Sequence, residues 1–174
     1  MIFTLCIIAA LALAFCVNGL LQPSHFSVSR SISINRIPET VFPLIEDLKS
    51  WDAWSPWAEK DPAMTKQFSD PSDGVGASYM WDGNKDVGKG KMTITDITMH
   101  KSVSINLDIE TPFEAHNNVL FSLQSKNNET LATWQMSGPQ NFVMRALSYF
   151  FNMDRMVGKD FETGLRSLKA LVED

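Results

Sequence analysis

Strand-like alternation over most of the chain, followed by one long amphipathic segment, most constrains the fold. Apolar and polar residues alternate at residues 26–34 and 103–109, as expected of half-buried strands. At residues 153–172 the apolar residues recur at spacings of three and four, which predicts an amphipathic helix of roughly five turns. Gly158 and Gly164 in this helix would allow its backbone to approach a sheet closely. The order predicts a curved antiparallel sheet wrapped around a long C-terminal helix.

The other strands of this sheet are predicted at residues 64–68, 77–81, 88–97, 119–123 and 130–137, which gives about seven strands in all. Asn127 and Asn128 are expected to form a hairpin turn. Pro38 is expected to open a helix that ends near Lys49. Its apolar stripe consists of Val41, Phe42, Ile45 and Leu48.

The first 21 residues form an apolar segment without a charged side chain, and the first charged side chain of the sequence is Arg30. Because about 20 apolar residues in a helix match the thickness of a bilayer, we expect residues 1–21 to form a single transmembrane helix. A cleaved signal peptide and a buried core helix are the alternatives. Residues 22–25 then form a linker, and residues 26–174 one domain. Arg30 and Arg36 favour a cytoplasmic position for that domain.

Charge and cysteine content exclude several classes of function. The net charge is -5, and the 15 basic residues are scattered, so no basic surface for nucleic acid is expected. Cys6 and Cys16 are the only cysteines, and both lie in the N-terminal segment. The domain therefore has no internal disulfide and no thiolate for catalysis or metal binding.

A set of ordered motifs extends over the whole predicted domain. The motifs are WDAWSPW at 51–57, DP at 61–62, GVG at 74–76, WDGN at 81–84, VGKG at 87–90, TLATWQMSG at 130–138 and GKDFETGLRSLK at 158–169. Together they resemble the polyketide cyclase/dehydrase branch of the START-like (SRPBCC) superfamily. The resemblance implies an α+β helix-grip fold with a cavity between sheet and helix. The arrangement of a membrane segment followed by such a domain also resembles that of bacterial members of the superfamily. The resemblance implies no catalytic residue, because the superfamily includes carriers, receptors and cyclases.

Ten side chains are expected to line this cavity. Residues in the same phase of a strand share one face of the sheet, and this parity selects the strand positions. The terminal helix adds two side chains from its apolar stripe, and the loop after the first helix adds two tryptophans near an entrance. The ten residues are Trp54, Trp57, Tyr79, Trp81, Met92, Ile94, Trp134, Met136, Met156 and Phe161. The alternative for each of them is plain core packing.

Side chains suited to catalysis are few. His25, His100 and His116 lack the spacing of metal ligands, and no nucleophile, phosphate-binding or dinucleotide motif is present. We therefore predict no metal and no cofactor. Asp96 lies in phase with the apolar residues of its strand, and Asp160 borders the inward face of the terminal helix. A carboxylate that faced an apolar pocket would have a raised pKa and could serve as an acid or base.

Three functions are consistent with these features. The leading hypothesis is a non-catalytic, membrane-anchored module that binds a small hydrophobic ligand, lipid-like or polyketide-like. The alternative is a cyclase or dehydratase acting on a hydrophobic substrate, which requires a buried ionisable group such as Asp96, Asp160 or Tyr79. The third is a scaffold whose 51–57 loop docks a protein partner, which requires its rings to be exposed as a patch.

Overall fold

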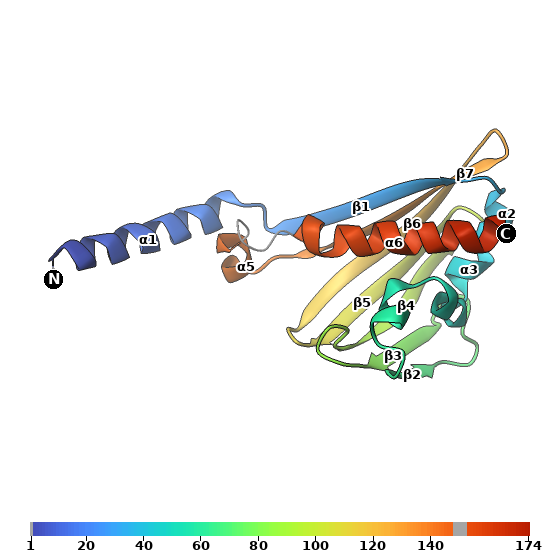
Figure 1. Ribbon diagram of the computed structural model, residues 1–174, viewed down its shortest axis with the longest axis horizontal. Coiled ribbons are helices and arrows are strands. Elements are labelled where there is room, and N and C mark those ends of the chain that lie inside the picture. The colour runs from blue at the N-terminus through green and yellow to red at the C-terminus, as the bar shows by residue number, and fades with distance from the viewer. Residues whose placement is uncertain (1, 148–152) are drawn as a thin grey trace.

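A seven-stranded antiparallel sheet grips the long helix α6 (Met153–Glu173), which confirms the predicted helix-grip architecture (Figure 1). The structure is a computed structural model that describes residues 2–147 and 153–174. Met1 of the predicted membrane segment and residues 148–152 of the predicted domain lie outside the described residues. The strands are β1 (His25–Ile34), β2 (Thr65–Phe68), β3 (Ser78–Asp82), β4 (Lys89–Thr98), β5 (Ser102–Thr111), β6 (Ala115–Lys126) and β7 (Glu129–Pro139).

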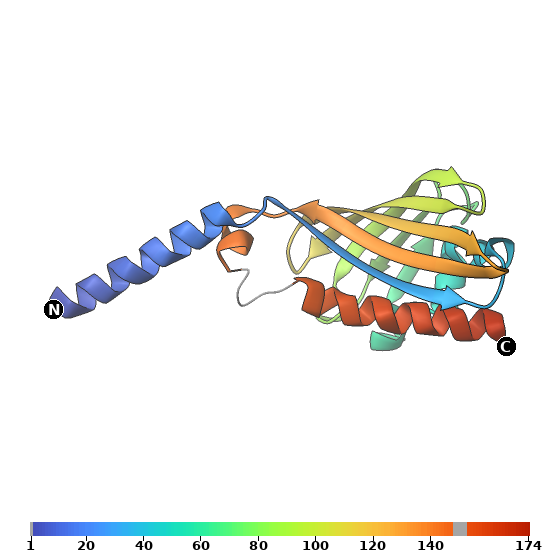
Figure 2. The ribbon, with the colours of Figure 1, turned by 90° about the horizontal axis from the view of Figure 1, so that it is seen from above.

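The strand order is β1-β7-β6-β5-β4-β3-β2, so the first strand pairs with the last one. The sheet is strongly twisted, and α6 lies against one of its faces beside β1 (Figure 2). Helix and strand run in the same direction. Arg30, in the middle of β1, binds Asp154 at the start of α6, and further along the Nζ atom of Lys169 donates to the carbonyl oxygen of Ser33 at 2.8 Å.

The predicted helix after Pro38 is broken into three short segments. These are α2 (Pro38–Val41), α3 (Pro43–Glu46) and the 3-10 helix η1 (Leu48–Ala53). Pro43 is the cause, because proline lacks the N–H that a continuous helix needs and fits best at the start of a helix. The predicted apolar stripe is nevertheless buried, with Val41, Phe42, Ile45 and Leu48 at 1 % exposure or less.

Asp47 holds the last of these segments in place. Its carboxylate accepts hydrogen bonds from the backbone N–H of Lys49 and from the hydroxyls of Ser50 and Ser72. Partial burial alone would raise the pKa of Asp47, but these three bonds outweigh it and hold the pKa below its ordinary value. The segment that carries Trp51, the first tryptophan of the WDAWSPW motif, is thus fixed to the loop before β3.

Helix α1 (Ile2–Leu21) extends away from the domain, and its last turn meets the short helix α5 (Phe142–Ala146), which the sequence did not predict (Figures 1 and 2). The Nδ2 atom of Asn18 donates to the carbonyl oxygen of Ala146 at 2.8 Å. Gly19 lies directly against the ring of Phe142. The described residues include no helix that is both long enough and apolar enough to cross a membrane, so the predicted transmembrane helix is not supported.

Candidate ligand-binding site

The concave face of the sheet becomes more exposed row by row toward the end where α6 begins. The row of Val103, Phe121 and Trp134 is sealed, with no side chain more than 2 % exposed. The next row, Ile105, Val119 and Met136, is also buried. Beyond it Tyr79, Met92 and Asn117 are still buried, at 6–8 % exposure, whereas Phe26, Trp81 and Leu107 are partly exposed. We call this end of the concave face the open end; its residues are Phe26, Tyr79, Trp81, Met92, Leu107, Asn117 and Gly138.

The strand residues predicted from the alternation of the sequence do lie on the concave face of the sheet. Tyr79 pairs with Met92, and Trp81 pairs with Gly90 at the open end. Met136 lies one row deeper. Ile94 and Trp134 lie deeper still and are fully enclosed. The structure therefore brings Tyr79, Trp81 and Met92 together at the open end, where Trp81 is the partly exposed one of the three, and places the other three in the packed interior.

Six rings fill the middle of the space between sheet and helix, and we call them the aromatic cluster: Trp51, Trp54, Trp57, Phe121, Trp134 and Phe161. Trp134 stacks on Phe161 of α6 with ring centroids 4.4 Å apart and planes 8° apart. Trp54 and Trp134 approach at 5.5 Å in an edge-to-face arrangement. Such pairs add stabilisation beyond simple burial. The middle of the space between sheet and helix is thus packed core. Of the two loop tryptophans predicted to line a cavity, Trp54 is part of this core.

The WDAWSPW segment is tied inward by the indoles themselves. The Nε1 atom of Trp51 donates to the carbonyl oxygen of Ile45 at 3.0 Å, and that of Trp54 to Leu44 at 2.9 Å. Trp57, the first-turn residue of α4 (Pro56–Lys60), is only half-buried and lies 6.4 Å from Phe161. Trp51 was not among the predicted site residues, although its spacing of three from Trp54 indicated a shared helical face.

Stacked rings line the far side of the open end. Tyr79 stacks between Phe68 at 4.8 Å and Trp81 at 5.7 Å. The Trp81 ring lies so close over Gly90 that any side chain there would collide with it. Burial raises the pKa of Tyr79 to about 12, so its phenol stays protonated at neutral pH.

Three of the side chains singled out from the sequence do not face the concave side. Met156 is 57 % exposed on the outer side of α6, so the expectation that it faces inward is wrong. Asp96 is exposed because a β-bulge between Ile94 and Asp96 reverses the phase of the strand. Asp160 forms an ion pair with Lys60 at 2.6 Å at the edge of α4 and α6.

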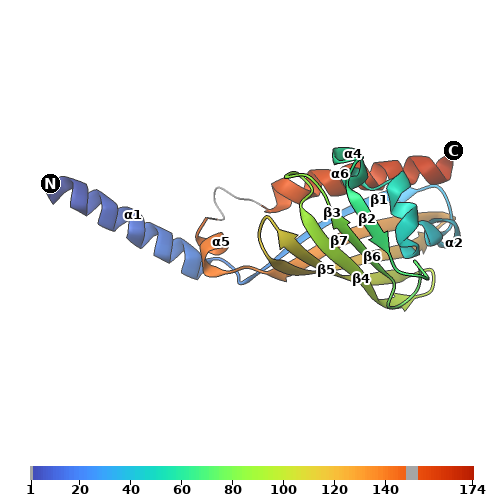
Figure 3. The ribbon, with the colours of Figure 1, turned by 90° about the horizontal axis from the view of Figure 1, so that it is seen from below.

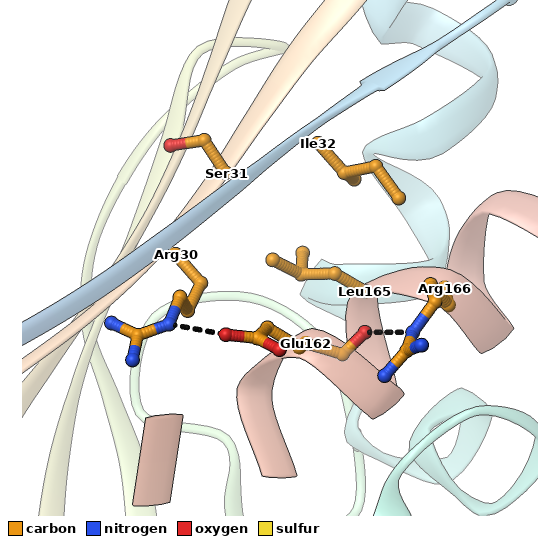
Figure 4. A pocket seen from close by; sticks show the side chains of 6 residues that line it. All are labelled: Arg30, Ser31, Ile32, Glu162, Leu165 and Arg166. Carbon is orange, nitrogen blue, oxygen red and sulfur yellow. Dashed lines mark hydrogen bonds and ion pairs between the residues drawn. The ribbon is translucent and has the colours of Figure 1, made fainter. Parts of the chain in front are cut away.

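A shallow groove of about 250 Å³ lies between β1 and α6 (Figure 4). Its lining residues are Arg30, Ser31, Ile32, Glu162, Leu165 and Arg166. The guanidinium of Arg30 binds Asp154 and Glu162, each at 2.7 Å, and its hydrogen bond to Asp154 lowers the pKa of that carboxyl group. Because Arg30 already has both carboxylates as partners, we interpret this groove as a clamp that holds α6 to β1. It is not the predicted apolar cavity.

Figure 3 shows the sheet from the side opposite to that of Figure 2, with α6 and α4 along one margin of the strands. This arrangement, a twisted antiparallel sheet with one long helix and a partly open apolar end, defines a helix-grip protein. The chain belongs to the polyketide cyclase/dehydrase and lipid transport family, whose model matches residues 25–173. The resemblance drawn from the motifs is thus confirmed at the level of the superfamily.

Solved structures of similar shape share little sequence with the chain. A protein of Mesorhizobium loti, MLL2253, is 15% identical with a TM-score of 0.62, covering 85% of this chain and 97% of its own. The Aha1 dimer of Colwellia psychrerythraea is 18% identical with a TM-score of 0.60, covering 85% and 96%. Major latex-like protein 151 of Panax ginseng is 13% identical with a TM-score of 0.58, covering 86% and 99%. At these identities the likeness shows the fold alone. No curated protein matches the chain.

Proposed function

We propose that the domain binds a small hydrophobic ligand, lipid-like or polyketide-like, at the open end of the concave face and performs no chemistry on it. The observation that carries this proposal is the gathering of half-buried large apolar side chains at that end. Phe26, Trp81 and Leu107 contribute from the sheet. Met153 and Val157 are partly buried on the first turns of α6, which lie beside Arg30 of β1. Partly solvent-exposed apolar side chains around a concave surface are typical of ligand-binding sites.

The positions of the three predicted ionisable groups favour a binding role over catalysis. An enzyme would need an ionisable group there, and three candidates were predicted. Asp96 is exposed on the outside of the sheet, and Asp160 is paired with Lys60. Tyr79 remains a neutral phenol, which can donate a hydrogen bond but cannot serve as a base.

The scaffold hypothesis required the rings of residues 51–57 to form an exposed patch. Trp51 is 4 % exposed and Trp54 is 2 % exposed, and both indoles bond to backbone within the domain. Their burial argues against docking of a partner through this loop.

A methionine-based NMR titration tests the binding proposal directly. The full chain, labelled with ¹³C at its methionine methyl groups, is titrated with octan-2-one, a small probe with an apolar tail. We expect the signals of Met92 and Met136 to shift, since these side chains line or floor the open end. Met80 and Met99 are exposed elsewhere and serve as internal controls. The proposal fails if no methionine signal shifts, or if only those of Met80 and Met99 do.

We also propose that residues 1–21 attach the domain to a membrane, with Arg30 and Arg36 favouring the cytoplasmic side. The support is the lack of charge in this segment and the direction of α1, which leads away from the sheet (Figure 1). We expect the full chain to sediment with membranes and to resist washing with carbonate. The variant Ile7→Lys/Leu13→Lys places two charges on exposed positions of α1 and should move the chain to the supernatant. Recovery of the unaltered chain in the supernatant would contradict attachment.

A further inference from the structure

Asn117 is a buried polar residue in the apolar phase of β6. It alternates with Val119, Phe121 and Leu123, all of which face the concave side. Its neighbour across β5 is Leu107, which pairs in turn with Met92 of β4. The side chain of Asn117 therefore lies within the open end, among the residues proposed above to contact the ligand.

The amide of Asn117 has no partner. The residue is only 6 % exposed, yet its side chain forms no hydrogen bond with any residue in the part of the chain that the structure describes. The polar atoms of the amide are not sealed off either, because among the described residues the Nε1 atom of Trp134 is the one fully enclosed polar side-chain atom without a partner. An unpaired amide that faces a concavity is thus suited to a hydrogen bond from outside the protein.

Gly138 makes room for this amide. A Cβ atom at position 138 would lie on top of the Oδ1 atom of Asn117, and it would also touch the Phe26 ring at 3.1 Å. The glycine on β7 therefore lets the Asn117 side chain lean across the neighbouring strand. The missing side chain and the unpaired amide together form a small polar position in an otherwise apolar surface.

No charged side chain belongs to the cross-strand row of Phe26, Gly138, Asn117, Leu107, Met92 and Tyr79. A ligand carboxylate would lose its hydration there and gain only neutral partners, and an ammonium group would find no carboxylate. An amide, in contrast, can donate to a carbonyl oxygen or accept from a hydroxyl group. The site chemistry matches a neutral polar group on an apolar body.

We propose that Asn117 is the specificity-determining contact of the open end and selects hydrophobic ligands that carry a neutral carbonyl or hydroxyl group. This inference rests on the proposed function, since it names the chemical class of ligand for the same site. The apolar body lies against Met92, Leu107 and Trp81, and the polar group bonds to the amide of Asn117. Free fatty acids and alkanes are the classes that this arrangement disfavours.

The test compares octan-2-one, octane and octanoate, with affinities followed by the methyl signal of Met92. In the isosteric variant Asn117→Leu we expect octan-2-one to bind about tenfold more weakly, the loss of one hydrogen bond. Octane should bind to this variant as tightly as to the unaltered chain or slightly more tightly, because an apolar side chain replaces the polar amide in the site. Octanoate should bind more weakly than octan-2-one to the unaltered chain.

Asn118 provides a matched control, since it is the same residue type one position along β6 but is exposed on the opposite face. Asn118→Leu should leave all three affinities unchanged. Gly138→Ala is the second variant, because it keeps the amide but displaces it, and it should also weaken octan-2-one selectively.

The outcomes separate the two proposals. If octane and octan-2-one bind but Asn117→Leu and Gly138→Ala affect them equally, the role of Asn117 is refuted and the hydrophobic site stands. Tighter binding of octanoate than of octan-2-one likewise refutes the neutral class. If none of the probes binds to the unaltered chain, the proposed function fails and this inference fails with it.

Discussion

Replacing Trp134 with alanine is expected to lower the free energy of unfolding by about 3–5 kcal/mol, the usual loss when a large buried ring is truncated. Trp134 is 2 % exposed and lies within 6.0 Å, centroid to centroid, of all five other rings of the aromatic cluster. Its removal leaves a cavity that rings held by β6, α6 and η1 cannot close without shifting those elements. Chemical denaturation followed by far-UV circular dichroism measures the change.

Two further variants show whether the loss comes from packing. Trp134→Phe keeps a ring in the cluster, and it also removes an indole N–H that has no hydrogen-bond partner among the described residues. Because no hydrogen bond is lost, this variant should cost clearly less than alanine does. Phe113 is 81 % exposed, so Phe113→Ala should change the free energy by no more than about 0.5 kcal/mol. An equal loss for Trp134→Phe and Trp134→Ala would mean that ring packing is not the cause.

Period-two alternation predicted the sheet well because a buried face forces side chains of one phase to be apolar. All seven predicted strands are present, and Tyr79, Trp81 and Met92 lie on one face as expected. The same reasoning failed for Asp96, since a bulge adds one residue to β4 and reverses the phase beyond it. The sequence of the strand carries a sign of the bulge, since Ile97 is apolar and lies in the opposite phase to Met92 and Ile94.

The polar position at Asn117 was also visible in the sequence. It precedes Val119, Phe121 and Leu123 at intervals of two, so strict parity places a polar residue on the apolar face. An amide at such a position is as anomalous as a carboxylate, because both bring polar atoms to an apolar face. The pairing of β1 with β7 and the partnership of Asn117 with Gly138 join residues far apart in the chain, and local periodicity carries no information on them.

How far the interior is filled could not be predicted from the pattern either. A strongly curved sheet around a helix was expected to leave enclosed apolar space. Trp51, Trp54 and Trp134 instead occupy the middle of the concave face with packed rings. The difference arises because the WDAWSPW segment is held inward by hydrogen bonds from the indole N–H groups of Trp51 and Trp54 to backbone carbonyl oxygens of α3.

Gly164→Leu is expected to be strongly destabilising, by about 3 kcal/mol, although leucine favours a helix more than glycine does. A Cβ atom at position 164 would lie 2.8 Å from the Trp134 ring and 3.0 Å from the Cδ atom of Pro56. Neither neighbour can move away easily, since the ring is enclosed by the aromatic cluster and Pro56 is the first residue of α4. The helix would have to lift off the sheet, which would also separate Phe161 from Trp134.

Ala170→Leu supplies the control for this prediction, because it adds the same side chain to an exposed position of α6. It should change the free energy of unfolding by no more than about 0.5 kcal/mol. Gly158→Ala should fall between the two variants, since its Cβ atom would meet the guanidinium of Arg30, a side chain that can shift at the surface but only by weakening its bonds to Asp154 and Glu162. If Gly164→Leu unfolds at the same denaturant concentration as Ala170→Leu, then α6 does not lie as close to β7 as the helix-grip arrangement requires, and the open end would not have the shape on which the proposed ligand site depends.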